Sequence, residues 1–379
     1  MNCSGFLSLA GWLCLAVASR GAADEAVSPS PSGRIRASWR SPEGQGRNTG
    51  VPPVYPLWDG HETIAQYARR VSLPETKTLD LGNGVSLELV LIPAGKFIMG
   101  TPEPESPLIG FTISAIAGLI VLGLVVRLAW HADRQHRPFQ FSLCWLIFVV
   151  LILGVAQYGG FRYWRALHGP HNFSAVEMEC PAHVVTLARP FYMGKFGVTQ
   201  EQFQQVMGTN PSFFKGANLP VQKVSWDDAQ EFCKRVNEKA RQTVRLPTEA
   251  EREYACRAGT ATWYCTGNTT SDAVQEGWFG ENSQNTVHPV GQKTPNAWGV
   301  YDMHGNLYEW CQDWFEPYEA GEVVDPQGPA QGECRVLRGG SYCDSAWFSH
   351  STRRKGLDPE IRGGATGFRV VMETAPRTP

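Results

Sequence analysis

Two long apolar runs in the middle of the chain constrain its fold more than any other feature. Residues 108–126, which read LIGFTISAIAGLIVLGLVV, contain no charged side chain, and residues 140–161 contain none either. An α-helix rises about 1.5 Å per residue and the apolar core of a bilayer is about 30 Å thick, so each run is long enough to cross a membrane. Two buried core helices are the alternative, but runs separated by only 13 residues favour a transmembrane helical hairpin over residues 108–161.

The loop between the two runs, residues 127–139, is basic, with three arginines against one aspartate. Basic loops remain in the cytoplasm, so we expect this loop to be the cytoplasmic turn of the hairpin. Two crossings return the chain to its starting side. Residues 24–107 and 162–379 are therefore predicted to lie together on the non-cytoplasmic (periplasmic or extracellular) side of a membrane.

The N-terminal segment, residues 1–23, resembles a secretory signal. It has an apolar centre from Phe6 to Ala18 and ends in the small residues Gly21-Ala22-Ala23. The Lys or Arg that usually precedes the apolar centre is missing, so an uncleaved membrane anchor is the alternative to a cleaved signal peptide.

Composition excludes several other classes of protein. Acidic and basic residues nearly balance, with a net charge of −2, so no global field favours nucleic acid as a partner. The chain has 39 Gly, 26 Pro and 13 Trp but only 18% charged residues. These proportions indicate a loop-rich globular domain rather than a helical bundle or a disordered chain. The ten cysteines form no CxxC pair, which argues against a zinc ribbon or a thioredoxin-type motif.

The residues before the apolar runs divide into two parts. Residues 24–77 are predicted to be a Ser/Pro/Gly/Arg-rich linker followed by a short amphipathic helix at residues 62–71. Residues 78–107 form a first strand unit, in which two strands flank Asn83-Gly84, a dipeptide favoured in tight hairpins. The leucines of the second strand alternate with polar or exposed positions, which is typical of a half-buried strand.

After the apolar runs, two helices carry clear end signals. Thr199 is a good N-cap with Gln202 at the third helical position, and Gly208 ends the helix. Ser225 caps a second helix, WDDAQEFCKRVNEKA, whose two aspartates suit its positive N-terminal end. Beyond Arg245 we expect mostly turns and short strands.

Seven segments occur in an order that carries a family resemblance. They read LELVLIPAGKFIMG, RPFYMGKFGVTQEQF, PVQKVSWDDAQEFC, VRLPTEAEREYACRAG, HPVGQKTPNAWGVYDMHGNLYEWCQDW, RVLRGGSY and GATGFRVV. This order resembles the formylglycine-generating enzyme, or sulfatase-modifying factor, family over about residues 78–101 and 180–371. The resemblance implies an irregular α+β fold of the C-type-lectin-like kind, low in regular structure. The transmembrane insertion would interrupt this domain, and residues 162–379 would complete it.

The segment YDMHGNLYEW, residues 301–310, is the candidate metal site. Asp302 and Glu309 place two carboxylates seven residues apart, with the carbonyl groups of Gly305 and Leu307 between them. Calcium takes about six to eight oxygen ligands from side chains and backbone. The resemblance implies a structural Ca²⁺ at these four positions. The alternative is that the carboxylates cap turns beside a Trp-rich core.

The catalytic site implied by the resemblance is incomplete. Family enzymes oxidise a substrate cysteine to formylglycine with O₂ and hold Cu(I), a metal that thiolates suit, on two cysteines five residues apart. Here Cys343 matches the first cysteine and Ser341 matches the active-site serine, but Phe348 stands at the second cysteine and Ala365 near an active-site asparagine. Copper would need a recruited ligand, for which His350 is the nearest candidate. A structural thiol or a disulfide partner is the alternative for Cys343.

Two further cysteines lack the partners that the resemblance implies. Cys233 and Cys256 match family cysteines that form disulfides. Their partner cysteines in the family lie near the C-terminus, at positions roughly equivalent to Arg354 and Val370 here. These two thiols must therefore pair elsewhere or stay free. Another family branch binds iron through an HxxxHxE-type cluster, which this sequence does not contain.

Two functions follow from these observations. The first is a membrane-anchored, exported binding or accessory module, stabilised by calcium and without the paired copper-binding cysteines. The second is an oxidoreductase of the same family that converts a protein cysteine to formylglycine, and so activates sulfatases, with altered metal ligation. The membrane and a sulfatase or another exported protein are the expected partners, and nucleic acid is not.

Overall fold

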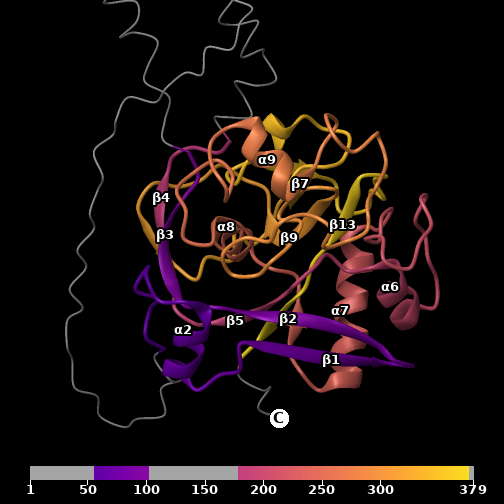
Figure 1. The fold of residues 1–379 in the computed structure, drawn as a ribbon, viewed down its shortest axis with the longest axis horizontal. Coiled ribbons are helices and arrows are strands. Elements are labelled where there is room, and N and C mark those ends of the chain that lie inside the picture. The colour runs from indigo at the N-terminus through magenta and orange to yellow at the C-terminus, as the bar shows by residue number, and fades with distance from the viewer. Residues whose placement is uncertain (1–54, 102–177, 375–379) are drawn as a thin grey trace, which may run out of the picture. The chain divides into compact units, whose positions relative to one another are not determined.

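The computed structural model describes residues 55–101 and 178–374, which form a domain of mixed helices and strands (Figure 1). The helices are α2 (Ile64–Val71), α6 (Gln200–Met207), α7 (Trp226–Ala240), α8 (Glu249–Arg257), α9 (Thr270–Glu276) and the 3-10 helix η1 (Ala346–Ser349). The first strands are β1 (Thr76–Gly82), β2 (Val85–Ile92), β3 (Gly95–Met99), β4 (His183–Leu187), β5 (Phe191–Gly194), β6 (Val244–Arg245) and β7 (Gly277–Trp278). The remaining strands are β8 (His304–Gly305), β9 (Tyr308–Trp314), β10 (Glu322–Val324), β11 (Arg335–Arg338), β12 (Arg354–Leu357), β13 (Thr366–Phe368) and β14 (Val371–Glu373).

The largest sheet has the strand order β1-β2-β5-β14-β6 and is antiparallel throughout. The predicted hairpin is confirmed: β1 and β2 pair across Asn83 and Gly84, whose φ angles are 54° and 79°. These are the positive values that such a turn requires. The half-buried pattern predicted for β2 is correct only for its first half. From Leu89 onward every residue is buried, because one apolar cluster covers Leu89 and Leu91 and a second one covers Ile92.

Two helices pack against this sheet, with α7 and α6 beside β1 and β2 (Figure 1). Both predicted N-caps are confirmed as capping boxes, at Thr199 for α6 and at Ser225 for α7. Gly208 ends α6 with a φ of 79°, as expected. Phe203 of α6 and Phe232 of α7 stack with ring centroids 5.9 Å apart. This aromatic contact joins the two helices in the main core.

A second sheet carries the candidate site, with the strand order β12-β11-β9-β13. Strand β9 lies between β11, which runs antiparallel, and β13, which runs parallel, so it is held on both edges. Its residue Glu309 is paired in register with Arg338 on one side and Gly367 on the other. A third sheet, β10-β4-β3, and the short pair β7-β8 complete the strand pairings of residues 55–101 and 178–374.

Beyond Arg245 the chain is mostly turns and short strands, as expected, but it also contains two helices that were not predicted, α8 and α9. Every residue of α8 is buried, although the helix carries Glu and Arg on all of its faces. These charges are paired inside the domain: Arg354 forms two hydrogen bonds of 2.7 Å to Glu249, and Arg338 lies 2.6 Å from Glu253. Ion pairing therefore allows the charged faces of α8 to be buried as well as its apolar residues, which pack in a core cluster.

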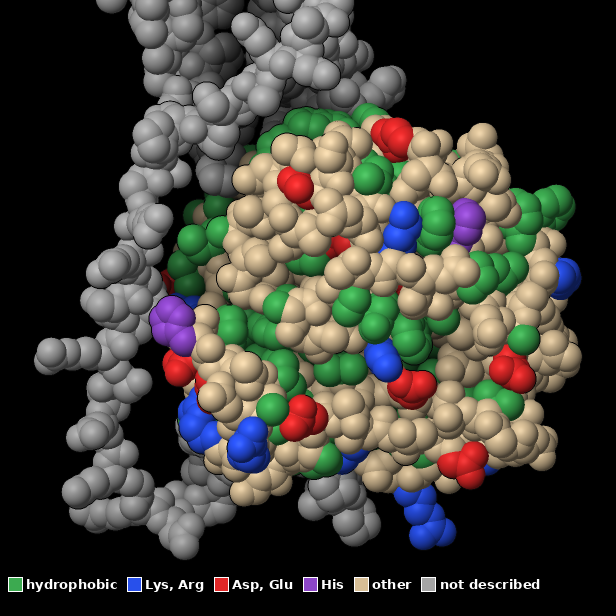
Figure 2. Space-filling model, viewed as in Figure 1, with side chains coloured by type: hydrophobic (Ala, Val, Ile, Leu, Met, Phe, Trp, Pro, Cys, Tyr) green, Lys and Arg blue, Asp and Glu red, His purple; other side chains and the backbone are tan. Residues whose placement is uncertain are grey.

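Several predicted features lie outside the described residues, including the signal-like segment and both apolar runs of the hairpin, 108–126 and 140–161. None of the helices that the structure does describe is long and apolar enough to cross a bilayer. The short amphipathic helix predicted at residues 62–71 is confirmed as α2, capped by Thr63. On the face shown in Figure 2, acidic and basic side chains are interspersed among apolar and neutral ones.

Candidate functional site

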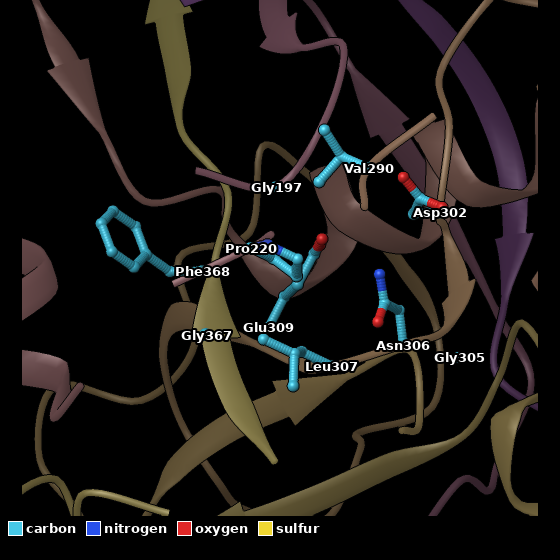
Figure 3. Close-up of a pocket in the computed structure, with 10 residues that line it drawn as sticks. All are labelled: Gly197, Pro220, Val290, Asp302, Gly305, Asn306, Leu307, Glu309, Gly367 and Phe368. Atoms are coloured by element: carbon cyan, nitrogen blue, oxygen red, sulfur yellow. The ribbon is translucent and has the colours of Figure 1, made fainter. Parts of the chain in front are cut away.

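The four positions predicted for calcium surround one small cavity at the start of β9 (Figure 3). Asp302 and Gly305 approach it with positive φ angles of 55° and 73°, backbone conformations that turn the chain around the cavity. Leu307 and Glu309 line it from the end of the same turn and from β9. About 10 Å³ is open to the centre of a water-sized sphere. A cavity of this size has room for a single water or ion.

Asp302 has an oxygen without a partner. Its Oδ2 atom accepts a hydrogen bond of 2.8 Å from the backbone N–H of Gly291, whereas Oδ1 is buried and has no hydrogen-bond partner. Burial raises the pKa of Asp302 to about 6, against the lowering effects of the Gly291 N–H group and Arg369. An unpartnered carboxylate oxygen beside an ion-sized cavity is what an oxygen-liganded cation would complete.

Glu309, in contrast, already faces two guanidinium groups. Its Oε2 atom lies 2.6 Å from Nε of Arg252, and its Oε1 atom lies 2.9 Å from Nη2 of Arg369. Burial would raise the pKa of Glu309, but the two arginines hold it below its usual range. Of the two predicted carboxylates, Asp302 therefore offers an unpartnered oxygen to a cation, while Glu309 would share its charge between a cation and two arginines.

The two residues predicted for catalysis lie together after β11. The hydroxyl of Ser341 lies 3.3 Å from the sulfur of Cys343 and donates a hydrogen bond to the carboxylate of Asp344. Ser341 is fully buried and Cys343 is exposed, so the thiol stands at the surface with the serine beneath it.

The other positions of the implied active site lie close by. The backbone N–H of Tyr308 donates to the carbonyl of Ala365 at 2.9 Å, which brings the position of the missing asparagine to the start of β9. Burial, followed by the nearby charge of Asp344, raises the pKa of Tyr308. Tyr308 and Ala365 thus connect the loop before β13 with the Ser341 turn.

Neither candidate for the second copper ligand is a suitable donor. Phe348 has no metal-binding atom and lies beside Arg353, whose guanidinium carbon is 5.3 Å from the ring centroid. The Nδ1 atom of His350 lies 2.8 Å from the Thr352 hydroxyl and its Nε2 atom lies 3.9 Å from the Glu179 carboxylate, so both ring nitrogens already have polar neighbours. The residues here do not fit a two-thiolate Cu(I) site. Across the described ranges, no three His, Cys, Asp or Glu side chains converge in a way that could hold a metal ion.

Sequence reasoning missed the buried charges around this region. Arg252 connects α8 to the cavity because its guanidinium contacts Glu309 and also donates to the carbonyl of Met303 at 2.9 Å. One local signal was present: Thr248 and Glu251 form a capping box, T-x-x-E, that starts α8. A second feature, the contact between Cys256 and His304, left no trace in the spacing of the sequence.

Comparison with known proteins identifies the family to which this chain belongs. Residues 159–374 match the family described as "Sulfatase-modifying factor enzyme 1-like domain", and the chain therefore belongs to that family. It is 30% identical to the formylglycine-generating enzyme of Mus musculus over 305 residues, which cover 76% of each chain. It is also 32% identical to "Chaperone protein LppX" of Paenibacillus barcinonensis over 237 residues, which cover 49% of this chain and 81% of that protein.

A solved structure supports the fold. "Treponema denticola variable protein 1" superimposes with a TM-score of 0.58 at 24% identity, covering 79% of this chain and 99% of that one. At this level of identity the likeness concerns the fold alone. The α+β architecture expected from the sequence is thus confirmed as that of the formylglycine-generating enzyme family.

Proposed function

We propose that this chain is a membrane-anchored, exported member of the family that acts as a binding or accessory module without copper-dependent oxidase activity. The observation that carries the proposal is the surrounding of Cys343. Its sulfur has a serine hydroxyl 3.3 Å away, and Phe348 occupies the position of the second cysteine. A single thiolate holds Cu(I) poorly because this metal prefers at least two soft ligands.

A peptide assay tests this proposal. The full chain, supplied with Cu(I) and O₂, is expected to leave the cysteine of a sulfatase-type CxPxR peptide unchanged, with a family enzyme from mouse as the positive control. Phe348→Cys is expected to raise Cu(I) affinity in a competition titration more than it raises conversion, because Ala365 still replaces the asparagine. Conversion of the peptide cysteine to an aldehyde by the wild type, and its loss in Cys343→Ser, would establish the oxidase instead.

The membrane anchor is supported by the point at which the insertion leaves the domain. The backbone N–H of Thr101 donates to the carbonyl of Glu179 at 2.8 Å, so residues that flank the two apolar runs lie side by side. An excursion that begins and ends at one point fits an even number of membrane crossings, because both ends must then emerge on the same side. The domain would be tethered through its own loop on the non-cytoplasmic side.

Calcium is the second part of the proposal. The unpartnered Oδ1 atom of Asp302, the carbonyls of Gly305 and Leu307, and Glu309 would hold a Ca²⁺ ion in the cavity at the start of β9. The ion would balance the negative charge of the buried Asp302 carboxylate, and it would join the 302–307 turn to β9. Its role here is structural.

The oxidoreductase reading remains the second candidate function. It is favoured by the positions of four residues: Ser341 lies beside Cys343, and Tyr308 is hydrogen-bonded to Ala365. These positions match the region that the family uses for catalysis. A sulfatase or another exported protein would be the partner in either case. In the first case it would be bound, and in the second it would be modified.

A further inference from the structure

Four side chains outside the sites described above form a continuous cluster of two thiols, an imidazole and a carboxylate, of which only one thiol is partly exposed. The Cys256 sulfur lies 3.3 Å from Nε2 of His304, and Nε2 lies 4.0 Å from Oε2 of Glu276. The Cys265 thiol donates a hydrogen bond to the same Glu276 oxygen. Cys256 comes from α8, Glu276 from the end of α9 and His304 from β8, so three elements meet here.

The orientation of His304 is fixed by a backbone group. Its Nδ1 atom lies 2.7 Å from the carbonyl oxygen of Ser349. Since a carbonyl only accepts, Nδ1 carries the hydrogen, and the Nε2 atom is thereby aimed at Cys256. Burial raises the pKa of the Cys256 thiol, but His304 and Arg252 outweigh it and lower the pKa to about 7.

The carboxylate of Glu276 is placed to serve the other thiol. Unlike Glu249 and Glu309, which face guanidinium groups, Glu276 faces the Cys265 thiol and the hydroxyl of Thr266 at 2.8 Å. Cys265 is partly exposed, whereas Cys256 lies inside. The two thiols are linked through one chain of contacts, because Cys256 touches His304, His304 lies beside Glu276, and Glu276 accepts from Cys265.

We propose that Cys256 and Cys265 are a peroxide-reactive pair that closes to a disulfide. The Cys256 sulfur attacks hydrogen peroxide, the O–O bond breaks, and a sulfenic acid forms with release of one water. The Cys265 sulfur then attacks the sulfenic sulfur, an S–S bond forms, and a second water leaves with the thiol proton. Two thiols are oxidised and one peroxide is reduced to two waters.

This pairing also answers a question left open by the sequence. The positions equivalent to the family's partner cysteines hold Arg354 and Val370, and the Arg354 side chain is bound to Glu249. Cys265, nine residues along the chain from Cys256, supplies a thiol instead. The proposal does not depend on the membrane anchor, on calcium or on the absence of oxidase activity.

Cys233 is a matched internal control. It is buried to the same extent as Cys256, with 2% of each residue exposed, but it lies in the apolar core and burial raises its pKa to about 12. If peroxide reacted with any buried thiol during opening of the fold, Cys233 and Cys256 would oxidise together. If the cluster activates Cys256, then Cys256 reacts first by more than about tenfold.

The experiment uses the full chain, reduced and then treated with one equivalent of hydrogen peroxide, alkylated and digested with trypsin. Cys256 and Cys265 fall in separate tryptic peptides, 253–257 and 258–293, and Cys233 falls in 224–234. The expected product is a disulfide that joins the first two peptides, while Cys233 remains alkylated. A pairing of Cys256 with another cysteine, or equal oxidation of Cys233 and Cys256, would overturn the proposal.

Two serine variants test the order of the steps and change little in volume. With Cys265→Ser, dimedone is expected to trap a sulfenic acid on Cys256, because the second thiol is missing. With Cys256→Ser, Cys265 is expected to stay reduced. The reverse pattern would contradict the assigned roles, as would a metal in the purified protein that shields both thiols from alkylation. Melting curves confirm that each variant is folded.

Discussion

Arg252 and Glu309 form an ion pair inside the domain, with 2.6 Å between Nε and Oε2 and almost no exposure of either side chain. Arg369 completes the arrangement from the other side at 2.9 Å. One carboxylate therefore balances two buried guanidinium groups that arrive from α8 and from the segment between β13 and β14. The pair joins the cavity at the start of β9 to the helix behind it.

Removal of this carboxylate charge should be costly. Glu309→Gln leaves two guanidinium groups without an anion, and breaking a buried pair costs about 3–5 kcal/mol. We expect that loss in urea unfolding in chelator, because the arginines need the charge whether or not a cation is bound, and a larger loss in calcium, where the variant also lacks a ligand.

The matched control for this change is Glu88→Gln. Glu88 forms a 3.0 Å ion pair with Lys195, but its side chain is 57% exposed. Exposed pairs are worth about 0–1 kcal/mol, so this variant should unfold close to the wild type. Equal stability losses in the two variants would show that the buried ion pair contributes no more to stability than the exposed one.

Calcium binding is better tested at Asp302 than at Glu309, because Glu309 also forms ion pairs with Arg252 and Arg369. The wild type should melt at a higher temperature in calcium than in chelator, since binding to the native state adds about 2.7 kcal/mol at a hundredfold excess over Kd. Asp302→Asn should lose this response. Asparagine tolerates the positive φ of this position, so backbone strain does not confound the comparison. Identical wild-type melting curves in calcium and chelator would exclude the site.

Local signals allowed much of the fold to be predicted, and long-range pairing accounts for what was missed. The caps at Thr199 and Ser225 and the turn at Asn83-Gly84 depend on residues within a few positions of one another, so the sequence displays them. Helix α8 depends on partners such as Glu309 and Arg338, which are more than fifty positions away. No periodic pattern can show that charged residues on every face of a helix will be buried.

The candidate site was also predicted only in part. Asp302, Gly305, Leu307 and Glu309 were found because one turn contains all four. The sequence could not show that Glu309 is held by two arginines while one oxygen of Asp302 is left without a partner. Both facts come from the meeting of β9 with α8 and with Arg369, which is a property of the assembled domain.

The predicted topology can be tested by labelling cysteines in intact cells. With the exposed Cys343 replaced by serine, a cysteine at the exposed position Gln331 should react with a membrane-impermeant maleimide. A cysteine at Gln135, in the basic loop, should react only after the membrane is opened. The Cys343→Ser parent gives the background. Labelling of position 135 together with protection of position 331 would reverse the orientation.

The pH dependence of stability should report on Asp313. This carboxyl group accepts a 2.7 Å hydrogen bond from the backbone N–H of Glu249, and burial followed by the charge of Glu249 raises its pKa to about 7. The folded state therefore binds a proton more tightly than the unfolded state does. The stabilisation that comes from this bound proton is fully present below about pH 4 and is lost as the pH rises to about 7.

Asp313→Asn keeps an acceptor for Glu249 and has no charge to bury. We expect it to match the wild type near pH 4 and to exceed it increasingly up to pH 7, by at most about 4 kcal/mol at about 1.4 kcal/mol per pKa unit. Asp80→Asn is the control, because Asp80 also accepts a backbone N–H at 2.7 Å but is exposed. Urea unfolding at a series of pH values measures the difference. If the difference in unfolding free energy between Asp313→Asn and the wild type stayed constant across this range, the prediction would be wrong. Asp313 would then be ionised in the folded domain throughout, with other groups compensating for its burial.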